Sequence, residues 1–555
     1  MNPMEVETKI CQSCKSRFSV DEEDAVMYRG FDIPLPEECH RCRIRNLFTF
    51  WIFGAFRKTT SALSGKSVIT NLPEDVPYPI YARDEWMSDA WDPMEHGREY
   101  DFSRGFFEQF KELQKAVPHP HQAGIDNVAC EWSDDIWNSK NCYLCRSLLG
   151  SEDLSYVFRV VNSKNSVDIT YCFDMDRSYD CLYCFKCYET KYAFDSRNCI
   201  TSAFLFDCRD LQNCFMCWNL RSKQYCIRNV QYTKEEYFEK LKELDLRSYA
   251  SVQKLKAEFA AIVEKEAVHR ENFNTQVSDC EGNFLTQCRN CRDCMLGEEG
   301  DNCRHVWRFL GGKDSIDCVG GGYVEKSALV AVGGWLYEAV ATVQSMRCRF
   351  SAYLEYCEEC EYCFGCVGIR KKKYCIFNKQ YTEAEYKELV GKIILAMKER
   401  GEWGRFFPLS FAGFGYNLSN AALLFPENKE SILGMGGLWH DFKDEAVSGM
   451  SADDLPDRID DVPDDIVKQA LTCPETKRRY NIAPHELAFY RQHGIPLPRR
   501  HFDLRTIERF RPIALAISPR DGACCFCSKP IVHYFPEELG YEKIACVECY
   551  QKEIV

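Results

Sequence analysis

The stretch CFMCWNLRSKQYCIRNVQYTKEEY, residues 214–237, recurs as CFGCVGIRKKKYCIFNKQYTEAEY, residues 363–386. A constant offset of 149 relates the two copies, and it also holds for cysteines outside them. Seven cysteine pairs coincide under this offset: Cys142 with Cys291, Cys145 with Cys294, Cys199 with Cys348, Cys208 with Cys357, Cys214 with Cys363, Cys217 with Cys366 and Cys226 with Cys375. A match of this length indicates that the centre of the chain is a tandem duplication, which decides the fold.

The duplicated centre is built from short units such as NSKNCYLC and LQNCFMC, in which Asn or Asp stands just before a cysteine position. The units are separated by fifteen, eighteen or twenty-four positions. This spacing is typical of a parallel β-solenoid, whose coils point small Cys, Ser or Val inward and turn at Asn, Asp or Gly. We therefore expect a mainly β fold with a duplicated, cysteine-rich parallel β-solenoid. The residues expected to point inward are Cys142, Cys199 and Cys214, with Cys291, Cys348 and Cys363 in the matching places.

An alternative use of the central cysteines is an iron–sulfur or thiol redox site. Three runs advance by three residues, as ferredoxin motifs do: Cys181, Cys184 and Cys187; Cys288, Cys291 and Cys294; and Cys357, Cys360, Cys363 and Cys366. No proline follows a fourth cysteine, and the offset aligns Leu211 with Cys360 and Gly333 with Cys184. Because buried reduced cysteine is a common core residue, the core interpretation is favoured.

Each copy is expected to end in a helix that caps the solenoid. Thr233 with Glu236, and Thr382 with Glu385, are T-x-x-E capping boxes, and apolar residues recur at helical spacing after each. Such helices would cover the last strand and prevent edge-to-edge association.

The two ends of the chain are related by a second, more diverged repeat at an offset of 462. RFSVDEEDAVMYRGFDIPLP at residues 17–36 faces RYNIAPHELAFYRQHGIPLP at residues 479–498. Each end keeps one set of four cysteines in two CxxC pairs: Cys11, Cys14, Cys39 and Cys42 at the front, and Cys524, Cys527, Cys546 and Cys549 at the back. Four thiolates complete a closed tetrahedron, so we expect two structural zinc ions in terminal zinc-ribbon modules.

Each end has also lost the set that the other keeps. The replaced positions are Ser61, Ser64, Ala82 and Glu85 at the front, and Cys473, Thr476, His501 and Leu504 at the back. Cys473 and His501 alone are too few ligands, so a decayed site is expected there. Cys525, which stands between two ligands, is expected to be a spare thiol.

A basic segment offers a nucleic-acid alternative. Its five cationic residues are Arg41, Arg43, Arg45, Arg57 and Lys58, interleaved with Phe48, Phe50, Trp51, Phe53 and Phe56. Basic loops with exposed aromatics can hold phosphates and stack bases. RCRIR alternates like a strand, however, which would place the arginines outside and the aromatics inside. The chain as a whole carries a net charge of -14, so a protein partner is preferred.

Composition bounds the remaining possibilities. The 555 residues include 34 cysteines, and 45% of the residues are hydrophobic, which indicates several folded domains. No run of about 18 apolar residues occurs and the first residues lack an apolar signal core, so we expect a cytoplasmic protein with reduced thiols. A Gly-rich phosphate loop, HExxH and G-x-S-x-G are all missing from the sequence, and no enzyme activity is expected.

The sequence divides into six expected segments. These are an N-terminal zinc-ribbon module (1–100), a helical connector (101–129), a first solenoid repeat with capping helices (130–268), a second repeat with its capping helix (269–400), an aromatic then acidic linker (401–470) and a C-terminal zinc-ribbon module (471–555). The function expected for this arrangement is a non-catalytic, zinc-binding scaffold or interaction protein.

Several stretches resemble one family. They include CQSCKSRFSV (11–20), IPLPEECHRCR (33–43), SDAWDPMEHGREYDFSRGFFEQFKEL (88–113), the two central repeats and DDLPDRIDDVPDDI (453–466). Over nearly its whole length the chain resembles an uncharacterised, cysteine-rich, zinc-ribbon-flanked family of candidate-phyla (Patescibacteria) bacteria. The resemblance implies zinc-ribbon ends but no activity. That family has fuller cysteine sets at both ends, and the replacements in this chain leave two zinc ions.

Overall fold

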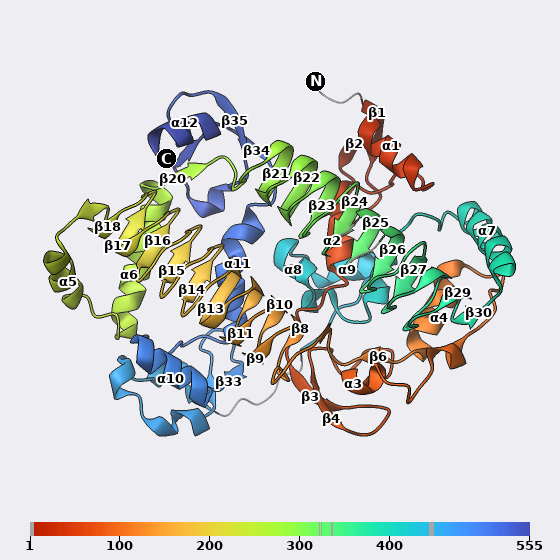
Figure 1. Cartoon of the computed structure of the whole chain (residues 1–555), viewed down its shortest axis with the longest axis horizontal. Coiled ribbons are helices and arrows are strands. Elements are labelled where there is room, and N and C mark those ends of the chain that lie inside the picture. Colours follow the sequence, from red (N-terminus) through yellow and green to blue (C-terminus); the bar gives the residue numbers. More distant parts are fainter. Residues whose placement is uncertain (1–4, 321, 324, 333, 335–336, 443–448) are drawn as a thin grey trace. The chain divides into compact units, whose positions relative to one another are not determined.

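The computed structural model describes residues 5–320, 322–323, 325–332, 334, 337–442 and 449–555. It is mainly β with helices (Figure 1). The chain divides into two compact units. Unit 1 comprises Met1–Gln122 and Asn272–Asp441, and unit 2 comprises Ala123–Glu271 and Phe442–Val555. Each unit therefore combines one terminal part of the chain with one half of the duplicated centre.

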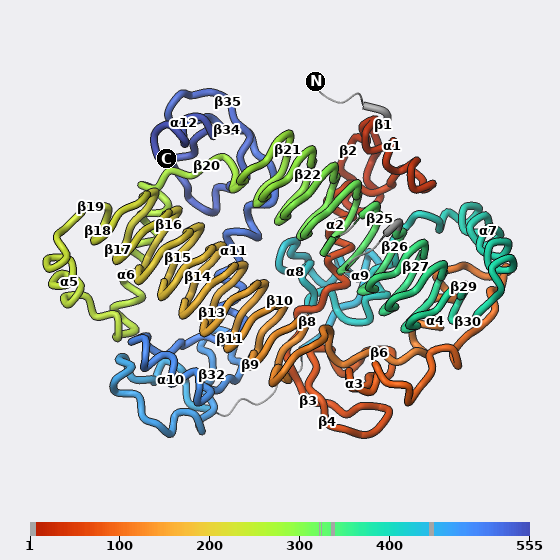
Figure 2. Tube along the Cα trace, in the orientation of Figure 1, coloured from red at the N-terminus to blue at the C-terminus, as the bar shows by residue number. Residues whose placement is uncertain are grey.

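The centre of unit 2 is a 13-stranded sheet, here called the first stack. Its strands are β7 (Gly124–Ile125), β8 (Asp134–Trp137), β9 (Lys140–Tyr143), β10 (Arg146–Leu149), β11 (Glu152–Ser155), β12 (Phe158–Val161), β13 (Lys164–Phe173), β14 (Tyr179–Leu182), β15 (Lys191–Phe194), β16 (Ala203–Phe206), β17 (Gln212–Trp218), β18 (Gln224–Ile227) and β19 (Val230–Gln231). Neighbouring strands are parallel except for the final β18–β19 pair. Paired residues such as Arg146↔Phe158 and Ala203↔Phe215 stand twelve positions apart, so the chain returns to the same edge once in every twelve positions (Figure 2).

A three-residue rhythm explains this return. From Asn141 onward, one residue in three has a left-handed backbone, with φ of 53° at Asn141, 52° at Leu144 and 61° at Ser147. As far as Cys217, the residue that follows each of them points inward and is buried, for example Cys142 and Cys145. Twelve residues per turn divided by three residues per side gives four sides. The sequence gaps of fifteen, eighteen and twenty-four positions are multiples of the three-residue side, so they did not reveal the twelve-residue turn.

The left-handed residues carry a local cost, roughly 1–2 kcal/mol for each residue with a side chain. Asn and Asp tolerate this conformation best, which accounts for their frequent place just before the inward residue. The buried column of the first stack offsets the cost because small Cys, Ser and Val and a few Leu side chains fill its narrow interior, among them Cys181, Cys184 and Cys187.

The centre of unit 1 is a 10-stranded sheet, here called the second stack. Its strands are β21 (Ser278–Thr286), β22 (Arg289–Glu298), β23 (Asp301–Trp307), β24 (Ile316–Val319), β25 (Glu325–Ala331), β26 (Tyr337–Val343), β27 (Ala352–Glu355), β28 (Glu361–Phe364), β29 (Lys373–Ile376) and β30 (Lys379–Gln380). The bounds of β27, β29 and β30 equal those of β16, β18 and β19 plus 149. The twelve-residue register also recurs, as in Cys363↔Cys375.

Helices follow both stacks as expected. The predicted capping boxes are confirmed: Thr233 caps α5 (Lys234–Lys242), and Thr382 caps α7 (Glu383–Glu399). In each box the threonine amide donates to the glutamate and the glutamate amide donates to the threonine hydroxyl. In unit 2, α6 (Tyr249–Lys265) packs its buried Leu255 and Ile262 on Phe204 and Phe215 of the first stack.

The terminal parts consist of small hairpins and helices. Unit 1 contributes β1 (Glu5–Ile10), β2 (Arg17–Asp21), α1 (Glu22–Gly30), α2 (His40–Phe48), β3 (Arg57–Thr60), β4 (Ser67–Thr70), β5 (Ile80–Tyr81), α3 (Arg83–Trp86), α4 (Phe106–Ala116), β6 (His119–Pro120), α8 (Asn420–Leu424) and α9 (Lys429–Gly434). Unit 2 contributes β20 (Val268–Arg270), β31 (Met450–Ser451), β32 (Leu471–Thr472), β33 (Arg479–Tyr480), α10 (Pro484–His493), α11 (Phe502–Leu515), β34 (Arg520–Ala523), β35 (Pro530–His533), β36 (Lys543–Ala545) and α12 (Val547–Glu553). None of the helices that the structure describes combines the length and apolarity that crossing a membrane requires.

A buried arginine anchors each terminal part to the stack of its own unit. In unit 1, Arg43 of α2 donates to Asp317 at 2.8 Å, and the Tyr28 hydroxyl donates to the same carboxylate. In unit 2, Arg505 of α11 forms an ion pair with Asp168 at 3.1 Å. The offset of 462 relates Arg43 to Arg505, and the offset of 149 relates Asp168 to Asp317. The same arginine–aspartate contact therefore occurs at equivalent positions in both units.

Around this shared pair the two anchors differ in charge. In unit 1, Arg304 of the second stack contacts the carboxylates of Asp21, Glu23 and Asp24 at the start of α1. The equivalent residue of the first stack is Ser155, whose hydroxyl lies 3.0 Å from His485 of α10. Unit 1 therefore has an arginine with three carboxylates at this place, whereas unit 2 has Ser155 beside His485, and Glu486 accepts a hydrogen bond from the Tyr156 hydroxyl.

Candidate metal centres

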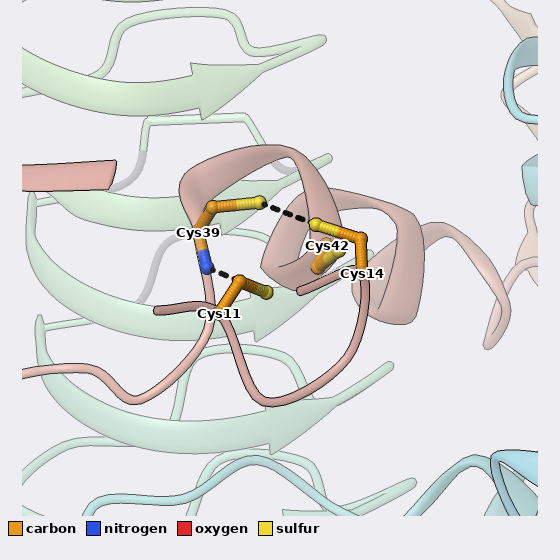
Figure 3. Close-up of side chains that lie close together, drawn as sticks. All are labelled: Cys11, Cys14, Cys39 and Cys42. Atoms are coloured by element: carbon orange, nitrogen blue, oxygen red, sulfur yellow. Dashed lines mark hydrogen bonds between the residues drawn. The ribbon is translucent and has the colours of Figure 1, made fainter. Parts of the chain in front are cut away.

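The front cysteine set lies where the β1–β2 hairpin meets α2. Cys11 and Cys14 lie in the turn of the hairpin, Cys39 is the N-cap of α2, and Cys42 is in its first turn. The four cysteine sulfurs all lie within 4.8 Å of one another (Figure 3). The structure thus brings together two CxxC pairs that stand well apart in the sequence.

The distances in the front set fit one tetrahedral ion. Zn–S bonds of about 2.3 Å imply sulfur–sulfur separations of about 3.8 Å. The sulfurs of Cys14 and Cys39 are 3.7 Å apart, and the Cys39 amide donates to the Cys11 sulfur at 3.3 Å. A tight turn holds Cys11, because its amide donates to the Ser16 carbonyl and its carbonyl accepts from Lys15, whose φ is 60°.

The electrostatics of the front set favour thiolate at Cys14 and Cys39, whereas burial raises the pKa of Cys11 and the hydrogen bond to Cys39 raises the pKa of Cys42. The hydrogen bond from Cys42 lowers the pKa of Cys39 to about 4, although burial opposes this. Burial would also raise the pKa of Cys14, but the Ser16 hydroxyl and amide outweigh it and the pKa falls below its ordinary value. A cation binds thiolates and not thiols, so these groups are prepared for a metal ion.

The back set repeats this geometry. Cys524 and Cys527 lie in the turn of the β34–β35 hairpin, Cys546 is the N-cap of α12, and Cys549 lies in its first turn. The sulfurs of Cys527 and Cys546 are 4.0 Å apart, and the four ligand atoms again lie within 4.8 Å of one another. Cys525 is exposed and is not a member of the group. Both terminal groups could therefore hold a metal ion.

The front positions that lack cysteine form a hydrogen-bond network. The hydroxyls of Ser61 and Ser64 both donate to the carboxylate of Glu85, and the Ala82 amide donates to Ser61 at 3.2 Å. This network joins the turn of the β3–β4 hairpin to α3, which contains Glu85 and has Ala82 as its N-cap. The register of the hairpin, Arg57↔Thr70, equals that of β34–β35, Arg520↔His533. At these four positions the front module has hydrogen bonds to the Glu85 carboxylate, whereas the back set has four cysteine thiols.

The decayed positions at the back also serve the fold. His501 is the N-cap of α11, where its Nδ1 accepts from the Asp503 amide at 3.1 Å. Burial lowers the pKa of this imidazole to about 3, so it is neutral and able to accept. Cys473 is buried beside Thr476, and neither it nor His501 belongs to a group of three metal-type ligands among the described residues.

The basic segment is not a strand, and this expectation was wrong. RCRIR begins α2, so its arginines do not alternate between two faces. Arg43 is buried against Asp317, and Arg45, 6% exposed, pairs with Glu427 at 3.3 Å. The aromatic expectation was right for Phe48, Phe50 and Trp51, which are buried.

The other cations of the segment lie differently. Arg41 stacks over Phe425 at 5.6 Å, Arg57 donates to the carbonyls of Leu72 and Pro73, and Lys58 is exposed. The five residues therefore do not share the exposed face that phosphate binding needs.

The central cysteines act as hydrogen-bond donors within the stacks. The Cys181 thiol lies 3.3 Å from the Tyr179 carbonyl and 3.5 Å from that of Thr190 in the next turn. Cys360 repeats this pattern with Glu358 and Ile369 at 3.3 and 3.4 Å. In the described part of the chain, no three stack cysteines gather their sulfurs as the terminal sets do. Their spacing of three residues follows from the three-residue side and needs no cluster to explain it.

Sequence reasoning missed one further group. His40 of α2 and two residues of the second stack, Asp293 and His305, also bring metal-type ligand atoms within 4.8 Å of one another. These residues lie in no spaced motif, and only the docking of α2 on the stack unites them. Comparison of this chain with known family models and with curated proteins found no match, so it gives no information about these sites.

Proposed function

We propose that the protein is a non-catalytic scaffold in which two structural zinc ions hold small terminal ribbon modules, each packed on a β-solenoid. The observation that carries the proposal is the convergence of four thiols at each end, at separations that suit one tetrahedral ion. Four protein ligands leave no position for water or substrate, so these ions would be structural. No catalytic role follows from them.

The solenoid part of the proposal rests on the two stacks. Parallel strands in a twelve-residue register, with an inward residue at every third position, are what a four-sided solenoid requires. Its repeated sides offer a long regular surface, which is how repeat proteins commonly bind other proteins. We therefore propose a protein partner in preference to nucleic acid, since Arg43 and Arg45 are buried and the net charge is -14.

The thiols also bear on the compartment. None of the 34 cysteines forms a disulfide in the described structure, and most are buried. Such a chain fits a reducing compartment, and we propose the cytoplasm.

Metal analysis of protein purified without oxygen tests the proposal. We expect two tightly held zinc ions per chain after exchange into buffer with a weak chelator, because both thiolate sets are closed. Cys14→Ser and Cys527→Ser should each leave one. Since zinc binding supplies folding free energy, each variant should also lose order in its own ribbon.

Cys525→Ser is the matched control, because Cys525 adjoins a ligand but lies outside the set, and it should keep both ions. Stoichiometric iron with visible charge-transfer absorption would instead support the cluster alternative for the central cysteines.

A further inference from the structure

We propose that unit 1 holds a third, different metal site, in which His40, Asp293 and His305 bind one divalent cation of the zinc, cobalt and nickel class. Its three ligand atoms lie within 4.8 Å of one another. A shift of about an ångström would bring them to the separations found around such an ion.

His305 is oriented for this role. Its ring is 5% exposed, its Nε2 lies 3.2 Å from Asp24 Oδ2, and its Nδ1 faces Asp293 Oδ2 at 3.4 Å. Arg304 holds the other oxygen of Asp24 at 2.9 Å. A carboxylate on one ring nitrogen fixes the orientation of the ring, so that a metal ion can take the place of a proton on the other nitrogen, which is the usual arrangement around histidine ligands.

The Nδ1 atom of His305 supplies an independent observation. It is buried, and it makes no hydrogen bond of acceptable geometry in the described structure. Its nearest charged group is Asp293, whose side chain is 41% exposed. A buried ring nitrogen aimed at a half-exposed carboxylate, without a proper hydrogen bond, is what a site prepared for a cation looks like.

His40 completes the set from the other side. It is the first residue of α2, and its ring stacks on His305 at 5.0 Å with an angle of 9° between the planes. Because an ion lies in the plane of each imidazole that binds it, His40 must turn its ring out of this stack. The residue is only half-buried, which leaves room for that rotation.

Unit 2 shows that the fold does not require this polar group. The equivalent residues there, by the offsets of 462 and 149, are Phe502 for His40, Leu144 for Asp293 and Tyr156 for His305. The rings of Tyr156 and Phe502 pack at 5.3 Å, much as the two histidines do. Aromatic packing is thus retained in both units, while three metal-type ligands gather at these positions in unit 1.

The chemistry of this site differs from that of the cysteine sets. Two imidazoles and one carboxylate are three protein ligands, which leaves at least one position for water. Imidazole and carboxylate ligands are harder than thiolates, and the site is accessible to solvent through Asp293 and His40. Its ion should therefore exchange with the solution, whereas the thiolate-bound zinc ions should not.

Cobalt titration of the full chain, with both cysteine sets already loaded with zinc, tests the proposal. We expect one Co²⁺ per chain beyond the two zinc ions, with visible d–d bands but without the intense thiolate-to-cobalt charge transfer. Asp293→Asn and His305→Tyr should weaken this cobalt binding at least about tenfold, and Asp24→Asn by about 10–100-fold through loss of ring orientation.

The controls separate binding from folding. Asp293→Asn keeps a residue suited to the left-handed backbone at φ 49°, and Asp279→Asn changes an exposed residue of the same kind at φ 50° in the same stack. The Asp279 variant should bind cobalt as the parent does, and the zinc content of all variants should stay at two. The proposal is overturned if the parent takes up no third ion, or if the folded Asp293→Asn variant binds cobalt as tightly as the parent.

Discussion

Arg43 and Arg505 are the residues on which the docking of each terminal part depends. Both guanidinium groups are at most 10% exposed, and each meets an aspartate of its stack that is 1% exposed. Removing two charges from water is unfavourable unless they compensate each other closely. Tyr28 adds a hydrogen bond to the same carboxylate in unit 1. The pair is therefore more sensitive to the loss of one partner than to the loss of both.

Arg43→Met tests this sensitivity. It leaves Asp317 charged, buried and uncompensated, and we expect unit 1 to lose about 3–5 kcal/mol of stability. Hydrogen exchange should accelerate in residues 5–122 and 272–441 and stay unchanged in residues 123–271 and 449–555. Arg505→Met should give the converse pattern with a smaller loss, because Arg509 still pairs with Asp168 at 3.0 Å. Arg43→Met with Asp317→Leu should recover part of the loss in unit 1. Equal acceleration in all segments would contradict an anchor that acts within one unit.

At the scale of the element, the β3–β4 hairpin and the β34–β35 hairpin are the same structure with different chemistry. Their strands have equal lengths and equal register. One turn carries Ser61 and Ser64, which donate to Glu85, and the other carries Cys524 and Cys527. A carboxylate that accepts hydrogen bonds from two hydroxyls satisfies the turn, so this hairpin forms without a set of four cysteines.

A designed variant follows from this equivalence. Changing Ser61, Ser64, Ala82 and Glu85 to Cys should create a third closed thiolate site, and we expect the tightly held zinc to rise from two ions to three per chain. Atomic emission after exchange against a weak chelator measures this. The three-cysteine variant that keeps Glu85 should bind the added zinc more weakly. A zinc content that stays at two would show that the hairpins differ more than their register indicates.

Local signals in the sequence predicted some elements well. The capping boxes at Thr233 and Thr382 depend on residues three apart, so the sequence contains the whole motif. The two cysteine sets were equally readable, because CxxC turns are local. The helix that begins at His40 was misread, since RCRIR has the period of a strand and burial by the second stack decides its conformation. His40, Asp293 and His305 could not be predicted, because only tertiary docking joins them.

For the whole molecule, the main finding is that sequence order and structural partnership do not coincide. The terminal part at residues 1–122 belongs with the second stack, and the part after residue 449 belongs with the first. The duplication was visible in the sequence, whereas this pairing was not. It depends on contacts such as Arg43 with Asp317, which are 274 residues apart. The six segment boundaries expected from the sequence stay predictions.

Unit 2 should therefore fold by itself when its two parts are joined. We expect a chain of residues 123–271, a flexible linker and residues 449–555 to be monomeric, to unfold cooperatively and to hold one zinc ion at the back cysteine set. Circular dichroism and metal analysis measure both properties. The same chain with Cys549→Ser should lose the ion. Aggregation of the joined chain, with no cooperative transition, would contradict its independence.

The anchors also bear on how the chain is made. At about 5–20 residues per second, roughly 14 to 55 s pass between synthesis of Arg43 and of Asp317. Asp168 of the first stack leaves the ribosome earlier and offers the nascent front part a competing partner for Tyr28 and Arg43. The difference in charge works against this error: Ser155 stands there in place of Arg304, so Asp21 and Glu23 find their arginine only in the second stack. The ion pairs of unit 1 thus make docking on the second stack more favourable than docking on the first. They favour the correct pairing even though the first stack is synthesised earlier.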